Sequence, residues 1–311
     1  MEAIRLVETK DMSREDWLAW RKKGIGGSDT GAILGVNKWK SAIGVWLDKT
    51  DQVEEEQEQS EPAYWGNVLE ETVAKEFEAR TGLKVRRCNA ILQHPEIPYM
   101  LANVDRLIVG QNVGLECKTT SSYGKDEWES DEVPDSYYIQ CQHYMAVTGY
   151  DAWWIACLIG GQRFVHKKIE RNEELIKMIF ERAAAFWKCV EDKIMPATDD
   201  TEACAEDLKK LYPKSNGQAI ELPETAEIYI KQFEQAAAEE KEVTARKTAA
   251  QNALQQMLGE YETGSVFGRN VNWKVAKGRV TFDLKSFEKS YPDLAKPYKK
   301  EGKPSRRFSI K

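Results

Sequence analysis

The chain has 311 residues and a formal net charge of −6, with 41% hydrophobic and 31% charged residues. This composition is that of an ordinary folded protein and excludes wholesale disorder. Because it has no run of eighteen or more apolar residues, the sequence does not predict a membrane-spanning helix. The N-terminus also lacks the basic-then-apolar layout of a secretory signal, so we expect a cytoplasmic protein.

The cysteines and histidines are scattered. The six cysteines form no C-x-x-C pair, and none of the three histidines is paired at metal-ligand spacing. The spacing therefore favours neither a zinc site nor a disulfide framework. Any metal would have to be held by carboxylates, and hard cations such as Mg²⁺ or Mn²⁺ prefer such ligands.

The negative net charge argues against nucleic acid as a partner only if the charge is spread evenly, and it is not. Residues 268–311 carry thirteen Lys and Arg against four Asp and Glu, a local charge of +9 that leaves −15 for residues 1–267. Acids concentrate instead at 48–61, with seven against one lysine, and at 125–135, with six against one lysine. We therefore expect a basic C-terminal module on an acidic body, with two acidic loops that keep non-productive DNA away.

Capping and glycine signals predict three helices in the first eighty residues. Ser13 with Asp16 resembles a capping box for a helix that stops at Gly24. The stretch GIGGSDTGAILG predicts a glycine-rich loop running into a short helix, with Ser28 as its cap. Apolar residues at four-residue spacing predict an amphipathic helix over 62–82.

The middle of the chain alternates strand and helix patterns. We predict strands at 84–92, 99–109 and 113–119, the last two joined by a tight turn at Gly110 and Gln111, then a helix at 135–148, strands at 152–159 and 163–169, and a helix at 171–191. This order predicts an α/β (α+β) domain with a central sheet flanked by helices.

The last third of the chain has a different composition. Ala, Glu, Lys and Gln dominate 224–258, with no Gly or Pro, which predicts one long helix. Short strand-like pieces, SVFGRNVNWKVA and RVTFDLK, and a basic aromatic tail follow. The predicted organisation is a domain at 1–191, a linker with a short helix at 192–223, a long helical arm at 224–260 and a small basic module at 261–311.

The stretch GLECKT, residues 114–119, places a carboxylate and an ammonium on the same face of an otherwise apolar strand, as Glu116 and Lys118. If Gly110 and Gln111 form a two-residue type II′ turn, Asp105 lies opposite Glu116. Two carboxylates about 5 Å apart repel each other, so the pair requires a cation between them or a raised pKa. The alternative is a surface ion cluster of little energetic consequence.

Asp105 followed by Glu116, Cys117 and Lys118 resembles the PD-(D/E)xK nuclease motif, with ANVD in place of the usual proline-aspartate half. The wider pattern is similar to the YqaJ-like viral recombinase family of phage lambda-type exonucleases. Four further stretches carry this resemblance, which covers about 15–190: WRKKGIGGSD, WGNVLEE, YIQCQHYMAVTG and AWWIACLIGG. It implies a restriction-endonuclease-like core, whereas residues 192–311 resemble only C-terminal extensions of some phage and prophage proteins.

The resemblance also implies a role for each site residue. Magnesium ions, with Mn²⁺ as a substitute, would be held by Asp105, Glu116, the backbone carbonyl of Cys117, and Glu70. Lys118 would activate or orient the attacking water, and Gln140 would help to place it. The terminal 5′ phosphate of DNA would be bound by Arg21 and Ser28.

Most of these assignments have a plainer alternative. Glu70 can instead be a solvated helix residue, with Glu71 as the extra ligand, although the G-x-x-x-E spacing from Gly66 favours Glu70. Arg21 can be a surface charge, Ser28 a helix cap, and Gln140 a buried glutamine bonded to backbone. The aromatic residues of the basic tail can stack bases or form the core of a small domain.

The implied function is a magnesium-dependent exonuclease that degrades double-stranded DNA from its ends, 5′ to 3′, in a bacterial host cell. The exposed 3′ strand would serve recombination by a phage single-strand annealing protein, and the relatives imply a ring-shaped trimer. The alternatives are a structure-specific or restriction-like endonuclease and a non-catalytic DNA-binding scaffold.

Overall fold

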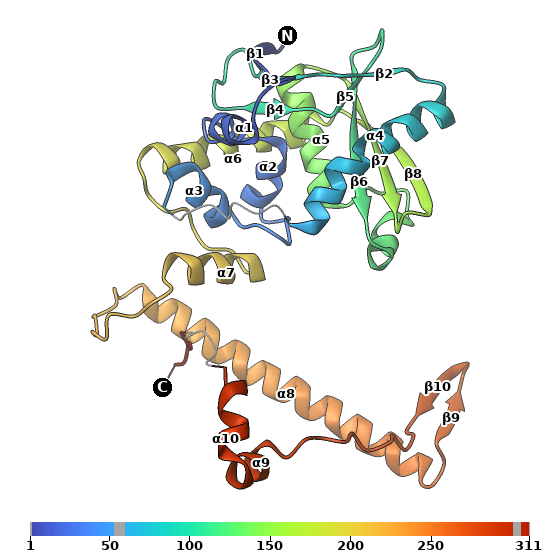
Figure 1. Cartoon of the computed structure of the whole chain (residues 1–311), viewed down its shortest axis with the longest axis vertical. Coiled ribbons are helices and arrows are strands. Elements are labelled where there is room, and N and C mark those ends of the chain that lie inside the picture. The colour runs from blue at the N-terminus through green and yellow to red at the C-terminus, as the bar shows by residue number, and fades with distance from the viewer. Residues whose placement is uncertain (1, 53–59, 301–305, 311) are drawn as a thin grey trace. The chain divides into compact units, whose positions relative to one another are not determined.

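The computed structural model describes residues 2–52, 60–300 and 306–310, so most of the predicted acidic loop at 51–61 and part of the basic tail lie outside the described residues. The chain forms two compact units, Met1–Pro213 and Lys214–Lys311 (Figure 1). None of the described helices is long and apolar enough to cross a membrane.

The first unit is built on a mixed five-stranded sheet in the order β2-β5-β6-β7-β8. Its parallel pair is β6 with β7, and the remaining pairs are antiparallel. The strands span Val85–Arg87 (β2), Arg106–Ile108 (β5), Val113–Thr120 (β6), Ala152–Ile159 (β7) and Arg163–Glu170 (β8). The expected α/β fold with a central mixed sheet flanked by helices is confirmed.

Helices cover both faces of this sheet (Figure 1). On one face, α4 (Glu61–Thr81) buries Val73 and Phe77 against Leu115 of β6. On the other, α5 (Asp135–Thr148) belongs to the main core with Ile155 of β7. Strand side chains alternate between the two faces of a sheet. Leu115 points to the α4 face, so its neighbour Glu116 points to the α5 face.

A second, three-stranded sheet has the order β1-β3-β4 and spans Ile4–Glu8, Ala90–Gln93 and Leu101–Asn103. Its presence corrects two predictions, since the strands expected at 84–92 and 99–109 are each divided between the two sheets. The first divides beside Asn89, whose φ of 51° turns the chain. The second divides at Val104 and Asp105, which places Asp105 in the connection between β4 and β5.

The hairpin of β5 and β6 has the predicted register, with Arg106 opposite Leu115, but the predicted turn is wrong. The strands end at Ile108 and resume at Val113, and the N–H of Gln111 donates to the carbonyl of Ile108 at 3.4 Å. Gly110, with φ of 76°, is therefore the third residue of this turn and not the first residue of a two-residue type II′ loop.

The remaining helices of the first unit match the predictions in kind, with small shifts at their ends, except that no helix was predicted at 42–50. Ser13 caps α1 as predicted, accepting from the Asp16 N–H at 3.0 Å, but α1 ends at Arg21, before Gly24. Ser28 does not cap α2, because the N-cap is Gly26. These helices are α1 (Arg14–Arg21), α2 (Gly27–Ile33), α3 (Ala42–Thr50), α6 (Glu173–Glu191) and α7 (Glu202–Leu211).

Helix α7 lies in the stretch expected to be a linker and packs on α3. The Ser41 hydroxyl donates to Asp207 Oδ2 at 2.8 Å, and Cys204 is part of the main core. The first compact unit therefore extends to Pro213.

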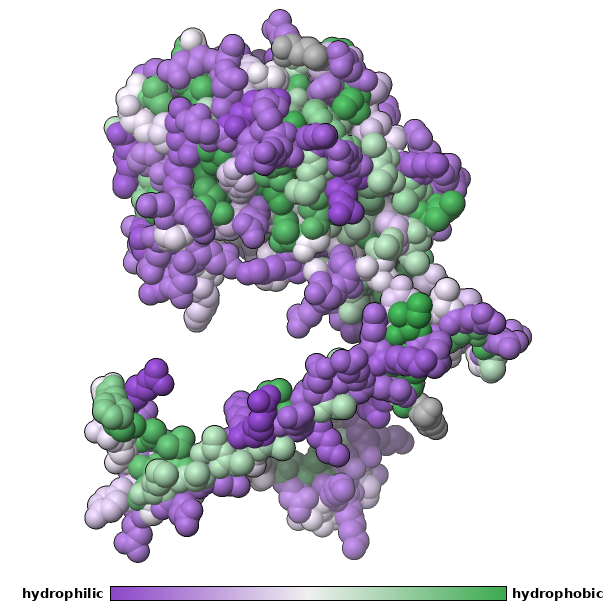
Figure 2. Space-filling view, turned by 180° about the vertical axis from the view of Figure 1, so that it is seen from behind, coloured by the Kyte–Doolittle hydropathy of each residue, from purple (hydrophilic) through white to green (hydrophobic). Residues whose placement is uncertain are grey.

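The second unit consists mainly of the long helix α8 (Ala226–Leu258), as expected from its composition. A hairpin of β9 (Thr263–Val266) and β10 (Arg269–Asn272) follows, and then α9 (Leu284–Ser290) and α10 (Pro292–Ala295). The second strand-like piece, 279–285, forms no strand among the described residues, because Asp283 accepts from the Ser286 N–H at 3.0 Å and caps α9. Apolar side chains remain open on the surface of this unit (Figure 2).

Candidate active site

The predicted site residues meet at one cleft of about 340 Å³ in the first unit. It is lined from α1, α2, α4, β6, α5 and the β4–β5 connection, and the lining includes Arg21, Ser28, Glu70, Asp105, Glu116 and Gln140. Lys118 joins this group through an ion pair with Glu116. Side chains that are far apart in sequence therefore surround one space.

Glu116 is 2% exposed, and its two carboxylate oxygens have different surroundings. Oε1 lies 2.6 Å from Lys118 Nζ and accepts from Gln140 Nε2 at 2.7 Å. Oε2 is buried and has no hydrogen-bond partner among the described residues. A buried carboxylate oxygen without a donor is costly, so this oxygen is suited to a ligand that brings positive charge.

Asp105 is held beside Glu116 by the backbone of β6, since its Oδ2 accepts from the Cys117 N–H at 2.8 Å. Burial, followed by the charges of Glu116 and Glu70, raises the pKa of Asp105 well above its usual value. Lys118 and the Cys117 N–H oppose this shift. A buried carboxyl group with a raised pKa is stabilised in its ionised form by a nearby cation.

Burial lowers the pKa of Lys118, but the charges of Glu116 and Asp105 outweigh burial and raise it above the usual value. The ammonium also lies 5.0 Å from the centre of the Tyr137 ring, in a cation–π contact. In this arrangement Lys118 is therefore a charged hydrogen-bond donor beside the two carboxylates.

Glu70 and Glu71 have different partners, although they are adjacent on α4. Both bind the buried guanidinium of Arg106, Glu70 through Nη1 and Glu71 through Nη2. Glu71 also accepts from Arg87 at 2.9 Å. Of the two glutamates, Glu70 lines the cleft and contributes to the raised pKa of Asp105.

The carboxylate oxygens of Asp105 and Glu116 suit a hard cation. Two observations support this fit: Glu116 Oε2 has no partner among the described residues, and the pKa of Asp105 is raised. The described residues contain no ready-made group of three or more His, Cys, Asp or Glu side chains that could hold a metal ion. Asp105 and Glu116 are therefore the principal pair, because the carboxylate of Glu70 is bound to Arg106.

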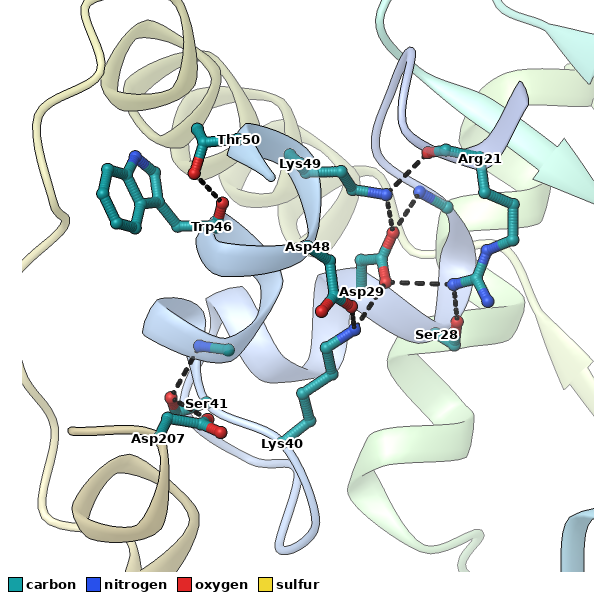
Figure 3. Close-up of polar contacts among 12 residues, drawn as sticks. Arg21, Ser28, Asp29, Lys40, Ser41, Trp46, Asp48, Lys49, Thr50 and Asp207 are labelled. Carbon is teal, nitrogen blue, oxygen red and sulfur yellow. Dashed lines mark hydrogen bonds and ion pairs between the residues drawn. The ribbon is translucent and has the colours of Figure 1, made fainter. Parts of the chain in front are cut away.

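In the same cleft, Arg21 Nη2 donates to Ser28 Oγ and to Asp29 Oδ1, both at 3.1 Å. Arg21 ends α1, and Ser28 lies in the first turn of α2. The two side chains predicted to act together are therefore in direct contact (Figure 3).

The sequence over 16–151 matches the model of the YqaJ-like viral recombinase domain. The chain is also 45% identical to the uncharacterized protein YqaJ of Bacillus subtilis (strain 168), over 98% of this chain and 97% of that protein. The chain belongs to the YqaJ-like viral recombinase family.

Solved structures resemble this member of the YqaJ-like family in fold. The structure of the exonuclease LHK-Exo from Laribacter hongkongensis in complex with dAMP is 22% identical, with a TM-score of 0.50. The match covers 58% of this chain and 94% of LHK-Exo. A phage-related exonuclease from Haemophilus somnus 129PT matches with a TM-score of 0.44 and 19% identity, over 55% of this chain and 95% of that one.

Three residues that line the cleft of this YqaJ-like chain or bind its lining residues were not predicted from the sequence. Arg106 holds Glu70 and Glu71, and the Tyr144 hydroxyl accepts from Gln140 Nε2 at 2.8 Å. Asp29 binds Arg21. Tyr144 could have been found from sequence, because it lies one helical turn after Gln140. Arg106 and Asp29 directly follow predicted site residues, but sequence position alone does not reveal their partners.

Proposed function

We propose that the chain is a magnesium-dependent exonuclease that degrades double-stranded DNA from its ends, 5′ to 3′, and exposes a 3′ single strand for recombination by annealing. The observation that carries this proposal is the pair Asp105 and Glu116 beside Lys118, with one buried oxygen of Glu116 lacking a partner. The exonuclease named among the structures of similar fold supports the same class of reaction.

Asp105, Glu116 and the backbone carbonyl of Cys117 would hold the metal. When bound, two Mg²⁺ ions would stabilise the charges on the attacking and leaving oxygens of a phosphodiester displacement. Glu70 is the better candidate than Glu71 for an additional ligand, because Glu70 lines the cleft and Glu71 is bound to two arginines.

Lys118 and Gln140 would place the attacking water. Both contact Glu116 Oε1. The same Gln140 Nε2 also donates to the Tyr144 hydroxyl, which leaves the amide oxygen of Gln140 to accept from the water. Because the pKa of Lys118 is raised by the carboxylates, its ammonium would donate a hydrogen bond to the water and orient it.

Arg21 and Ser28 would bind the terminal 5′ phosphate of the strand being digested. The guanidinium of Arg21 and the hydroxyl of Ser28 are groups that donate hydrogen bonds to phosphate oxygens. Both residues line the same cleft as the carboxylates. The distance between Arg21 and the carboxylates of Asp105 and Glu116 would then determine which phosphodiester bond, counted from the 5′ end, is cleaved.

We assign the catalytic domain to the first compact unit, Met1–Pro213, and not to the predicted range of 1–191, because α7 packs on α3. The remaining segments are a helical arm and a basic module. A phage single-strand annealing protein is the proposed partner of the product strand, and a ring-shaped trimer, as implied by lambda-type relatives, would enclose the DNA. Neither assignment affects the chemistry of the cleft.

Linear and covalently closed circular duplexes of the same sequence test the proposal. With Mg²⁺, the full-length protein should release nucleotides from the linear form and leave the circle intact, and Glu116→Gln should stop the release. Cleavage of the unnicked circle would replace the exonuclease with an endonuclease that uses the same carboxylates. No Mg²⁺-dependent cleavage of either duplex would contradict both.

A further inference from the structure

Asp29 is a buried carboxylate that follows the cleft residue Ser28 in sequence, and its side chain is 2% exposed. Its Oδ2 accepts from Lys49 Nζ at 2.8 Å and from the Gly26 N–H at 3.1 Å. Its Oδ1 accepts from Arg21 Nη2 at 3.1 Å and lies 3.9 Å from Lys40 Nζ. Figure 3 shows Arg21 of α1, Lys49 of α3 and Lys40 of the segment before α3 converging on this one carboxylate.

The surroundings of Asp29 keep it ionised. Burial alone would raise the pKa of Asp29, but Lys49, Arg21 and Lys40 together hold it well below its usual range. Lys49 is itself buried, with a side chain 3% exposed, and also donates to the Arg21 carbonyl at 2.7 Å. The backbone and the guanidinium of Arg21 are thus both tied to one buried ion pair.

Asp29 and Ser28 engage only one nitrogen of Arg21. Both contacts use Nη2, and Nε and Nη1 have no hydrogen-bond partner within the described part of the chain. The Trp17 ring lies 5.0 Å from Arg21 Cζ and restricts the guanidinium further. Since a guanidinium has five N–H groups, the remaining donors stay available to a ligand in the cleft that Arg21 lines.

The charge of the cluster favours an anion. Arg21, Lys40 and Lys49 face the two carboxylates of Asp29 and Asp48, the latter paired with Lys40, which leaves one positive charge in excess. A terminal phosphate monoester carries about −1.5 to −2 at neutral pH, whereas an internal phosphodiester carries one negative charge. The excess charge therefore favours a phosphorylated strand end over a hydroxyl end.

We propose that Asp29 is a positioning residue that acts through Arg21 and thereby sets the preference of the protein for 5′-phosphorylated DNA ends. This inference rests on the proposed role of Arg21 at the 5′ phosphate. Asp29 would not touch the DNA, and its effect would pass through the direction in which it holds the guanidinium.

The test variant must remove the ionised Asp29 carboxylate that holds Arg21 without leaving another buried charge unpaired. Asp29→Asn alone would leave the Lys49 ammonium without its partner, which is strongly destabilising. The double variant Asp29→Asn/Lys49→Met removes both charges of the buried pair. Lys49→Met alone, which keeps the contact between Asp29 and Arg21, is the first control.

Asp207→Asn is the matched control for a buried carboxylate outside the cleft. Asp207 is 6% exposed, accepts from Ser41 and pairs with Lys210 at 3.4 Å, and therefore resembles Asp29 in its surroundings without contacting Arg21. A general loss of rigidity would appear in this control as well.

Binding to two short duplexes, one with 5′-phosphate and one with 5′-hydroxyl ends and each labelled at a 3′ end, is measured in EDTA with the full-length protein. The readout does not require cleavage, so it is separate from the test of nuclease activity. We expect the wild type to prefer the phosphorylated duplex, and the double variant to lose about tenfold or more of this preference while its affinity for hydroxyl ends stays unchanged. Lys49→Met and Asp207→Asn should retain the preference.

Arg21→Gln supplies the decisive comparison. If Asp29 acts through Arg21, adding Arg21→Gln to the double variant produces no further loss of preference. Equal binding of both duplexes by the wild type, a double variant with wild-type preference, or additive losses in the combined variant would each overturn the proposal. A protein that prefers phosphorylated ends but never cleaves them would leave the proposal standing and remove the nuclease function.

Discussion

The two units of the molecule differ in how much of their apolar surface they bury. In the first unit, α4 and α5 cover opposite faces of the sheet, and residues such as Ile155 are fully buried. In the second unit, Leu258 and Ala295 are the hydrophobic residues buried among those described. Ile228 of α8, for example, is 58% exposed.

The same contrast holds for charge. The buried polar and charged side chains that the structure describes all lie in the first unit, from Asp29 to Asp207. An unpartnered carboxylate oxygen such as Glu116 Oε2 persists only where the surrounding packing fixes its position. The buried charged groups of the cleft therefore occur in the unit whose sheet is covered by helices, whereas the second unit leaves most of its apolar side chains exposed.

The exposed aromatics of the second unit bear on the two alternatives for the basic tail. Trp273, Phe282, Tyr298 and Phe308 are each 49% exposed or more. Phe282 contacts Phe287, with ring centres 5.0 Å apart, but these rings form no buried core. The described residues therefore do not support a small domain with these aromatics in its core.

Native-state hydrogen exchange should show the largest difference between the units. Amides of β7 should exchange only through global opening, at a cost of about 5–15 kcal/mol. Amides in the middle of α8 should open at a small fraction of that cost, because few buried contacts hold the helix. Equal protection of β7 and α8 would contradict the comparison.

A pair of isoleucine truncations should reproduce the difference on a smaller scale. Ile155→Ala removes a fully buried side chain and should lower the free energy of unfolding of the first unit by about 2–5 kcal/mol. Ile228→Ala should change the stability of the second unit by no more than about 0.5 kcal/mol. Urea unfolding, followed by the exchange of amides in each unit, gives both values.

The stability of the first unit should depend on pH through His143. Its Nε2 lies 2.8 Å from the Leu101 carbonyl, so Nε2 carries the proton, and Nδ1 accepts from the Thr30 hydroxyl at 2.7 Å. Burial lowers the pKa of His143 to about 4, against about 6.5 in the unfolded chain. Between these values the unfolded chain binds a proton that the folded chain does not, so stability falls as the pH drops through this window.

The contribution is complete above about pH 6.5, and up to about 3 kcal/mol is lost by about pH 4. Urea unfolding at several pH values measures it. His143→Gln, although less stable overall, should show a shallower pH dependence in this window, and an unchanged slope would exclude His143 as the cause.

Local sequence patterns were enough to predict the elements that pair or pack along their whole length within one layer of the fold. The helix at 135–148 and the strand at 152–159 have the predicted bounds. Pro134 and Gly149 delimit the helix, and Gly160, with φ of 57°, follows the strand. The strands at 84–92 and 99–109 were read as continuous because local pattern does not reveal the sheet to which each half belongs. The divisions beside Asn89 and Asp105 follow from long-range pairing.

The site residues that belong to a recognisable motif could be predicted from the sequence. Spacing and resemblance selected Asp105, Glu116 and Lys118, and the structure brings them together. Asp29 and Arg106 were missed because their significance depends on partners in other elements. A buried aspartate with three cationic neighbours cannot be distinguished in sequence from an acid in the first turn of a helix.

The most direct test of the account is the Mg²⁺-dependent release of nucleotides from linear duplex DNA by the wild type and by Lys118→Ala, with Lys168→Ala as a control on the edge strand β8. Lys118→Ala should lose about a hundredfold or more of the rate, while its binding of DNA ends and the activity of the control variant stay unchanged. Digestion by Lys118→Ala at the wild-type rate would contradict it.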